Sequence, residues 1–591
     1  MTNYSTSHWT VNEGKCGLLL FAQALEEMLN MHSYDSYKVP ALNFHYICLE
    51  ILNVIDLIET DIVDKGNLVP LLAEARTLFA QDKVAQSFLG NDFDAIFATK
   101  NSKGEYDRKP LKIESTKDVD QILPVIKKRI NYIVLELGRH NQYFSELIKM
   151  IRIQILDSKS DLSRLNSLYD LTRIVASELI NKGFSQAYIY NRIKHFFFNT
   201  QRVVDSVNII DEFFNCFSTD THKYSIYLPV NSIKQKNALE ECGPFQIAEN
   251  VYELFDATIP YILKFECESQ DPYSARNVAL NFINICLSLN QFIKHNKYAY
   301  NPKYSEVFDQ ESKEVTFIKK PIMPIMQSSS ALEKMKDIEI SDLLNACLKL
   351  DVGVFQALQS HSSAIISKSV DNQLINLWTA VEAMIPIIRK DGLVRINQIG
   401  NALVSALSKD YFSILLHQLV TDISILDKNC CEKIEQIDYK GTNAAKLVAV
   451  LLLSEYGAVY QEINKQIICV APLLACRMYR YKFQWANTKQ IQEMYKAHGE
   501  RLMQQIMRIY RTRNMLVHSG VSLRYTEYVL QNLHYYIDSF INLLIIYHKD
   551  GYTSVQTILD AIQLQEQQYL RLLSEATIVD KVNIKSYIHV E

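Results

Sequence analysis

Apolar residues recur at steps of three and four along most of the 591-residue chain, which is the spacing of one helix face. Leu18–Leu29 and Phe44–Ile58 carry such apolar stripes near the N-terminus. Another stripe lies in residues 371–388 and includes Leu374 and Trp378. Helix breakers are sparse, with 16 Gly and 13 Pro. The pattern therefore predicts a mainly α protein built from several helical blocks.

Residues 201–325 follow a different pattern. Lys223–Val230 alternates apolar and polar residues as a strand does, and Tyr261–Cys267 and Val315–Ile318 are two further strand candidates. A long amphipathic helix is predicted over Tyr273–His295. This region is therefore predicted to be a small α+β domain between helical blocks.

Charged loops and closely spaced breakers divide the chain further. Residues 100–118 form a charged loop, and residues 319–331, rich in proline and serine, are typical of a linker. The predicted regions are an N-terminal helical region (1–118), a helical hairpin region (119–200), the small α+β domain (201–325), a helical domain (326–550) with an insertion at about 390–490, and a C-terminal helix and tail (551–591).

The composition is that of a globular protein without a membrane span or a zinc site. A hydrophobic content of 48% and a charged content of 22% are ordinary for a globular protein. No apolar run reaches the roughly 18 residues that a membrane span needs. No basic segment precedes the first apolar stretch, so we expect no signal peptide, no membrane partner and a cytoplasmic location. The eleven cysteines lack the paired spacing of a zinc site, so we expect no metal and no cofactor.

The net charge of −4 gives no overall excess of cations, so a nucleic acid would need a local patch. Residues 477–524 contain ten basic residues against two acidic ones, a balance of +8. Cations alternate with aromatics in Arg477–Trp485, which suits the phosphates and stacked bases of single-stranded nucleic acid. A solvated basic face with its aromatics in the core would give the same pattern. The candidate RNA-binding residues are Arg477, Arg480, Lys482, Arg508 and Arg524.

Arg513, Asn514 and His518 lie near the end of a helix predicted over residues 499–519. Arg513 interrupts an apolar face, where a guanidinium is costly unless something pairs with it. Gly520 is a helix stop signal, which places His518 in the last turn, where the helix dipole favours the imidazolium form. Arginine suits a phosphate and histidine suits proton transfer near neutral pH. A carboxylate partner for Arg513 and a simple capping role for His518 would explain the pattern equally well.

The stretch from Arg513 through Asn514 to His518, followed by Gly520, resembles the Arg-x4–6-His signature of HEPN domains. In that family the signature lies between two long helices of a four- to five-helix bundle. The upstream segment Leu377–Met384 looks like the Trp-x-x-x-Glu-x-Leu helix of the ApeA-like HEPN branch, with methionine in place of leucine. More than 120 residues separate the two matches, which implies a large helical insertion.

The resemblance implies a metal-independent endoribonuclease in which the ribose 2′-OH attacks its own phosphate. Arg513, Asn514 and His518 would then be the catalytic residues, with Glu382 and Arg511 in supporting positions. Because one motif histidine per chain is short of an acid–base pair, the resemblance implies a homodimer that brings two motifs into one composite site.

The family's frequent setting is antiphage or abortive-infection defence, in which the RNA partner is tRNA or another cellular RNA. Residues 1–325 would then sense a phage-derived or nucleotide trigger, bind RNA or restrain the nuclease. Two other interpretations stay open. One is a non-catalytic HEPN module that binds RNA or a partner protein, and the other is a helical scaffold whose motif is coincidental.

Overall fold

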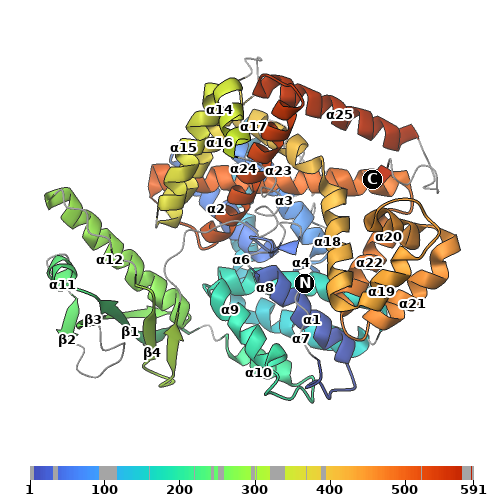
Figure 1. The fold of residues 1–591 in the computed structure, drawn as a ribbon. Helices are drawn as coiled ribbons and strands as arrows, with labels where there is room; N and C mark the ends of the chain where they lie inside the picture. The colour runs from blue at the N-terminus through green and yellow to red at the C-terminus, as the bar shows by residue number, and fades with distance from the viewer. Residues whose placement is uncertain are drawn as a thin grey trace, which may run out of the picture.

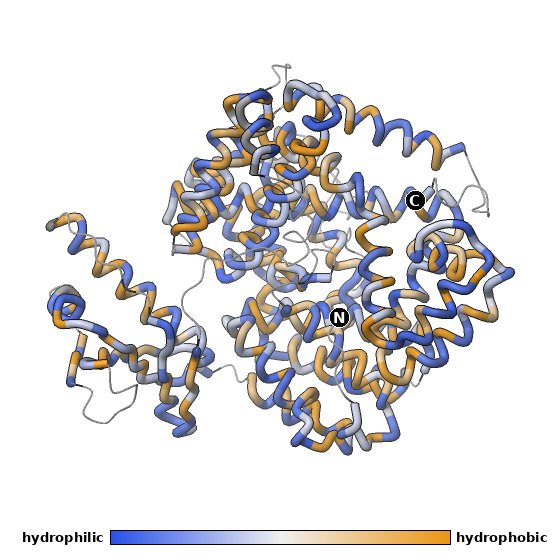
Figure 2. Tube along the Cα trace, viewed as in Figure 1, coloured by the Kyte–Doolittle hydropathy of each residue, from blue (hydrophilic) through white to orange (hydrophobic). Residues whose placement is uncertain are grey.

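The computed structural model describes residues 6–30, 33, 37–91, 93, 116–158, 160–217, 220–240, 245–249, 259–294, 300, 302–319, 340–367, 369–387, 394–520, 522–575 and 587–588. Within these ranges the chain is mainly helical with one small sheet, which confirms the predicted mainly α, multi-domain fold class (Figure 1). Hydrophobic and hydrophilic residues alternate along the helices, as amphipathic elements require (Figure 2). None of the described helices is both long and apolar enough to cross a membrane.

The N-terminal helices are α1 (Lys15–Leu29), α2 (Phe44–Glu59), α3 (Leu68–Gln81), α4 (Lys83–Leu89), α6 (Thr116–Gly138), α7 (Gln142–Ser158), α8 (Leu162–Asn181), α9 (Gln186–Ile193) and α10 (Ile209–Asn215). The C-terminal helices are α14 (Ile340–Lys349), α15 (Val352–Ile366), α16 (Val370–Met384), α17 (Arg395–Ser408), α18 (Tyr411–Leu426), α19 (Lys428–Glu435), α20 (Asn443–Leu452), α21 (Gly457–Ile467), α22 (Pro472–Gln484), α23 (Thr488–Ser519), α24 (Thr526–Lys549) and α25 (Val555–Glu575).

These two sets of helices share a single hydrophobic core. Buried residues from Trp9 to Phe217 and from Ala346 to Ile588 belong to one continuous cluster. Helix α1 packs against α7 and α8 and also against α22, which lies more than 440 residues later in the sequence. The predicted N-terminal and C-terminal helical regions are therefore halves of one helical body.

The α+β domain has a core of its own. Its antiparallel sheet has the strand order β2-β3-β1-β4-β5. Helices α11 and α12 accompany this sheet, and α12 packs against β1, β3 and β4. Figure 1 shows the domain beside the helical body. The elements are β1 (His222–Val230), α11 (Ile233–Glu240), β2 (Gln246–Glu249), β3 (Tyr261–Ser269), α12 (Pro272–Lys294), β4 (Ser305–Asp309) and β5 (Val315–Ile318).

One buried carboxylate joins this domain to the helical body. Asp271 caps the start of α12 by accepting hydrogen bonds from the backbone N–H groups of Tyr273 and Ser274. The same carboxylate accepts from the backbone N–H and the hydroxyl of Ser185, at 2.7 and 2.9 Å, where α9 begins. A single side chain thus fixes the starts of two helices in different cores.

Helices α15, α16, α17, α23 and α24 form a bundle in the C-terminal half. Helices α15 and α16 pack closely on each other, α16 packs on α23 and α24, and α17 packs on α23, α24 and α25. Helices α18 to α22 leave this bundle and pack on one another, and α22 packs against α1 and α8. The segment that leaves the bundle therefore spans about 411–484, shorter than the predicted insertion at 390–490, because α17 remains in the bundle.

The boundaries of two helices differ from the prediction for local reasons. Helix α23 starts at Thr488 rather than near Gly499, because Asn487 caps it by accepting from the backbone N–H of Gln490 at 2.9 Å. Helix α16 ends at Met384 rather than at residue 388, because Ile385 precedes a proline and adopts an extended backbone.

The contact between α15 and α16 leaves no room for a side chain at Gly353. A Cβ atom at this position would run into the backbone carbonyl oxygen of Ala383. We expect Gly353→Ala to destabilise the fold by about 1–3 kcal/mol, because backbone rather than a flexible side chain would have to move. Gly457→Ala is the matched control: no atom lies within 4 Å of its new Cβ, so a gain of up to about 1 kcal/mol is expected. Chemical denaturation measures both changes, and equal midpoints would contradict the close packing.

Candidate active site and interior polar clusters

The predicted motif occupies the last two turns of α23. Gly520 ends the helix in the left-handed conformation, with φ of 67°, and its N–H donates to the carbonyl of Leu516 at 3.1 Å. His518 is therefore in the final turn, where it is exposed together with Val517 and Ser519. An imidazole in this position is open to a substrate or to a second protein chain.

Arg513 and Asn514 are both half-buried and contact each other. The Arg513 guanidinium donates to the Oδ1 atom of Asn514 at 3.0 Å. Its Nε atom is buried, and within the described part of the chain it has no hydrogen-bond partner. No ion pair joins Arg513 to a carboxylate among the described residues, so the simple pairing considered from the sequence is not seen there.

The Trp/Glu helix lies against the motif helix. Trp378 of α16 is fully buried, and its ring centroid lies 5.6 Å from that of Tyr510, which is one turn before Arg513 on α23. The Trp378 indole donates to a carboxylate oxygen of Glu382 at 2.7 Å. Glu382 makes no ion pair with Arg513 among the described residues, so its observed contact is with the tryptophan that packs on the motif helix.

A second arginine fixes the end of α16. Arg395 donates to three backbone carbonyls, those of Glu382 at 2.9 Å, Ile385 at 2.6 Å and Pro386 at 3.0 Å. These carbonyls lack partners within the helix because α16 ends there. The segment that carries Trp378 and Glu382 is thereby held in a defined position beside α23.

Arg511 and Arg508 have a structural role. Arg511 is 3% exposed and donates to Glu50 of α2 at 3.1 Å, and Arg508 is 1% exposed and pairs with Glu74 of α3. Both side chains hold α23 against the N-terminal helices. The prediction of Arg508 as an RNA-binding residue is wrong for this reason, and Arg511 supports the motif only by fixing its helix.

Arg477 is also buried, so its prediction as an RNA contact is wrong as well. It pairs with Glu27 of α1 and lies 3.5 Å from Asp422 of α18. Two aromatic residues of the same run, Tyr481 and Trp485, are also buried, and their rings stack with centroids 4.5 Å apart. Core packing thus accounts for Arg477, Tyr481 and Trp485, whereas Phe483 of the same run is exposed.

The other three candidate RNA contacts are more accessible but already make contacts within the chain. Arg480 pairs with Asp170 at 3.0 Å, and the Lys482 ammonium lies 3.8 Å from the centroid of the Tyr460 ring. Arg524 is exposed and donates to the carbonyl of Asn181 at 2.8 Å. Of these, Arg524 is nearest to the motif in sequence, six residues after His518.

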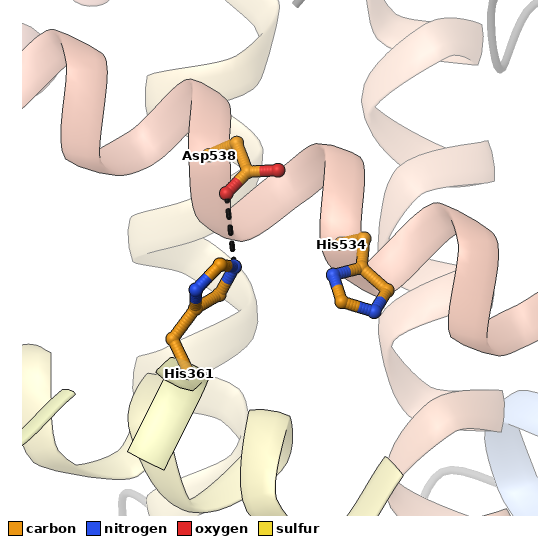
Figure 3. A group of neighbouring side chains, drawn as sticks. All are labelled: His361, His534 and Asp538. Atoms are coloured by element: carbon orange, nitrogen blue, oxygen red, sulfur yellow. Dashed lines mark ion pairs between the residues drawn. The ribbon is translucent and has the colours of Figure 1, made fainter. Parts of the chain in front are cut away.

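The fold also assembles a polar triad that local spacing did not reveal. His361 of α15 faces His534 and Asp538 of α24 (Figure 3). The Nε2 atom of His361 lies 3.2 Å from Asp538, and the nearest ligand atoms of all three residues lie within 4.8 Å of one another. His534 and Asp538 are one helical turn apart, a spacing readable from the sequence, but His361 lies more than 170 residues earlier.

The triad is buried and incompletely hydrogen-bonded. His534 is 1% exposed and Asp538 is 3% exposed. Within the described residues, Nε2 of His534 and Oδ2 of Asp538 have no hydrogen-bond partner. Burial, with smaller effects from His361 and Lys38, lowers the pKa of His534 to about 3, so this imidazole is neutral at pH 7. Burial raises the pKa of Asp538.

Two imidazoles and a carboxylate are a donor set that divalent transition metals accept. Donors on a tetrahedral zinc shell lie about 3.3 Å apart. The pair His361 and Asp538 already meets this spacing, and His534 would have to approach them by about 1–2 Å. Among the residues that the structure describes, these three are the group that could hold a metal ion.

We expect Zn²⁺ to stabilise the wild-type chain by about 2.7 kcal/mol at a hundredfold excess over its dissociation constant. His534→Ala should lose this stabilisation, because it lacks one of the three donors. The measured quantity is the difference in thermal midpoint between zinc-loaded and chelator-treated protein, taken within each variant. His417→Ala, at an exposed histidine of α18, is the control and should keep the wild-type difference. Equal differences in all three proteins would contradict metal binding by the triad.

Comparison with known proteins identifies no relative of this chain. A scan against protein-family models finds no match, and searches of curated proteins and of solved structures return none either. The resemblance to HEPN domains therefore stays a prediction based on the motif residues and their surroundings.

Proposed function

We propose that this protein is a metal-independent endoribonuclease of the HEPN type, with Arg513, Asn514 and His518 as its catalytic residues. The observation that carries the proposal is the packing of Trp378 on Tyr510. It brings together two sequence features that lie more than 120 residues apart, as the resemblance requires. The exposure of His518 and the lack of a described carboxylate partner for Arg513 also support it.

In the proposed reaction, His518 transfers protons and Arg513 binds the phosphate. A histidine in the neutral form removes the proton from the ribose 2′-OH, and the 2′ oxygen attacks the adjacent phosphorus. The bond from phosphorus to the 5′ oxygen breaks, and a second histidine in the protonated form gives that oxygen a proton. The products are a 2′,3′-cyclic phosphate and a 5′-OH. Arg513 binds the phosphate oxygens and stabilises their growing negative charge, while Asn514 orients its guanidinium.

The need for two histidines makes the proposed enzyme a homodimer. Each chain offers one His518 in the motif, at the exposed end of α23. Val517, which is 46% exposed beside it, adds an apolar contact surface at the same place. A second copy of this helix end would supply the missing acid or base.

The proposed substrate is cellular RNA, with tRNA as one candidate, and the proposed setting is antiphage defence. Both rest on the resemblance to the HEPN family. A non-catalytic HEPN module or a scaffold would keep the same helix packing but would not need an accessible histidine beside an arginine. The accessibility of His518 favours the nuclease.

We expect His518→Ala and Arg513→Ala each to lower RNA cleavage by at least about 100-fold, because one removes the proton-transfer group and the other the phosphate contact. The assay compares purified proteins on total RNA and maps the RNA ends in cells that express each variant. Cleavage ends should carry a cyclic phosphate, and DNA of the same sequence should stay intact because it lacks the 2′-OH.

Exposed residues outside the motif provide matched controls. His417→Ala on α18 and Arg571→Ala on α25 remove the same side-chain types and should keep wild-type cleavage. Undiminished cleavage by both motif variants, or products with a 5′-phosphate, would rule out the proposed mechanism.

The composite site predicts that activity depends on association. Specific activity should fall on dilution in parallel with the dimer fraction measured by sedimentation. Val517→Glu should weaken the dimer and lower the activity at a given concentration, because it puts a like charge on each facing surface. A monomer with full specific activity would contradict the composite site. It would not contradict catalysis by Arg513 and His518 of one chain.

A further inference from the structure

A cavity of about 320 Å³, partly open to solvent, lies where the N-terminal and C-terminal helices meet. Its walls come from the segment 37–42 and from helices that include α8, α18, α22 and α23. This volume is in the range of sites for small molecules and is too small for a folded RNA. The cavity runs beside the part of α23 that precedes the motif.

The cavity lining is strongly cationic. Six cationic side chains contribute to it and one carboxylate, that of Glu74. Carboxylates pair with three of the six, since Arg477 pairs with Glu27, Arg508 with Glu74 and Arg480 with Asp170. The cationic residues are Lys38, Arg173, Arg477, Arg480, Arg501 and Arg508.

Arg173 of α8 differs from these paired arginines. Among the described residues its guanidinium makes no hydrogen bond and no ion pair, although it lines the cavity and is only partly exposed. Burial lowers its pKa, and the neighbouring charges of Arg501 and Arg480 lower it further. The carboxylate of Asp170 partly offsets these effects but is paired with Arg480. Three arginines that share one carboxylate leave an excess of positive charge, so the site is suited to accept an anion.

A histidine on the motif helix gives a second, independent indication. His498 is 7% exposed, lines the cavity and stacks on Tyr411 with ring centroids 3.7 Å apart and an angle of 8°. Its ring nitrogens have no hydrogen-bond partner among the described residues. Burial, with a smaller effect from Arg501, lowers its pKa to about 3, so the neutral ring can donate one hydrogen bond into the cavity.

Arg501 completes the arrangement one turn further along α23. Its guanidinium donates to the Tyr411 hydroxyl at 3.1 Å and lines the same cavity. Arg173 and Arg501 therefore approach the cavity from helices of different halves of the chain. Guanidinium groups suit phosphate because their planar N–H groups bind its oxygens in pairs.

We propose that this cavity is a binding site for a phosphorylated small molecule of about mononucleotide size, whose phosphate is bound by Arg173, Arg501 and His498. Such a ligand relieves the repulsion between arginines on α8, α22 and α23 and draws these helices together. Its effect on the motif at the end of α23 would be regulatory, and that consequence alone rests on the proposed ribonuclease function. Binding itself is independent of any catalysis.

The test measures binding to the full chain by isothermal titration calorimetry and by thermal shift. The probes are inorganic pyrophosphate, ATP and adenosine. Saturable binding of pyrophosphate or ATP is expected, with no binding of adenosine, because the phosphate is the recognised group. If pyrophosphate binds as tightly as ATP, the phosphate is the recognised group. If ATP binds more tightly than pyrophosphate, the cavity also contacts the nucleoside. Absence of binding by both phosphate probes, or equal binding of adenosine and ATP, would overturn the proposal.

Arg173→Gln should weaken binding of the phosphate probe at least tenfold. It should also raise the thermal midpoint of the ligand-free chain, because a cationic charge is removed from beside two other arginines. Arg571→Gln, at an arginine on α25 whose side chain is 81% exposed, is the matched control and should change neither quantity. Wild-type affinity in Arg173→Gln, or a lowered midpoint without ligand, would contradict the proposed role of Arg173. Cleavage activity enters none of these readouts, so failure of the ribonuclease proposal would leave the result interpretable.

Discussion

Buried ion pairs between the first and last thirds of the chain are the interaction on which this architecture depends. Arg508 and Arg511 of α23 are neutralised by Glu50 and Glu74, and Arg477 is neutralised by Glu27. Removing one partner of such a pair leaves an unpaired charge in the interior and typically costs about 3–5 kcal/mol. The position of α23 therefore depends on α2 and α3, and that of α22 depends on α1.

This dependence explains which features the sequence could reveal. The amphipathic stripes predicted the helices, and the alternation in Lys223–Val230 predicted the central strand β1 of the sheet, because these signals are local. The capping of α23 by Asn487 extends the helix eleven residues before the predicted start at Gly499, and the sequence contains that signal too. Local periodicity and capping thus account for most of the secondary structure.

The functional assignment of the charges was less accurate for a physical reason. The excess of +8 in residues 477–524 counted cations within one segment, whereas the counter-charges of Arg477, Arg508 and Arg511 lie more than 400 residues earlier, on α1 to α3. Only pairing across the fold distinguishes Arg508, which is neutralised, from Arg513, which interrupts an apolar face as predicted and has no described carboxylate partner. The triad of His361, His534 and Asp538 was missed likewise, because two helices distant in sequence supply it.

Helix α23 is one uninterrupted helix of 32 residues, which makes it about 48 Å long. Arg501 and His518 are 17 residues apart on it, a separation of about 26 Å along its axis. A continuous helix has no hinge between these points, so a tilt at one of them is carried as a rigid-body motion to the other. A movement of α23 at Arg501, beside the cavity, would therefore displace His518 at the exposed end of the same helix. Side chains between the two positions need not rearrange.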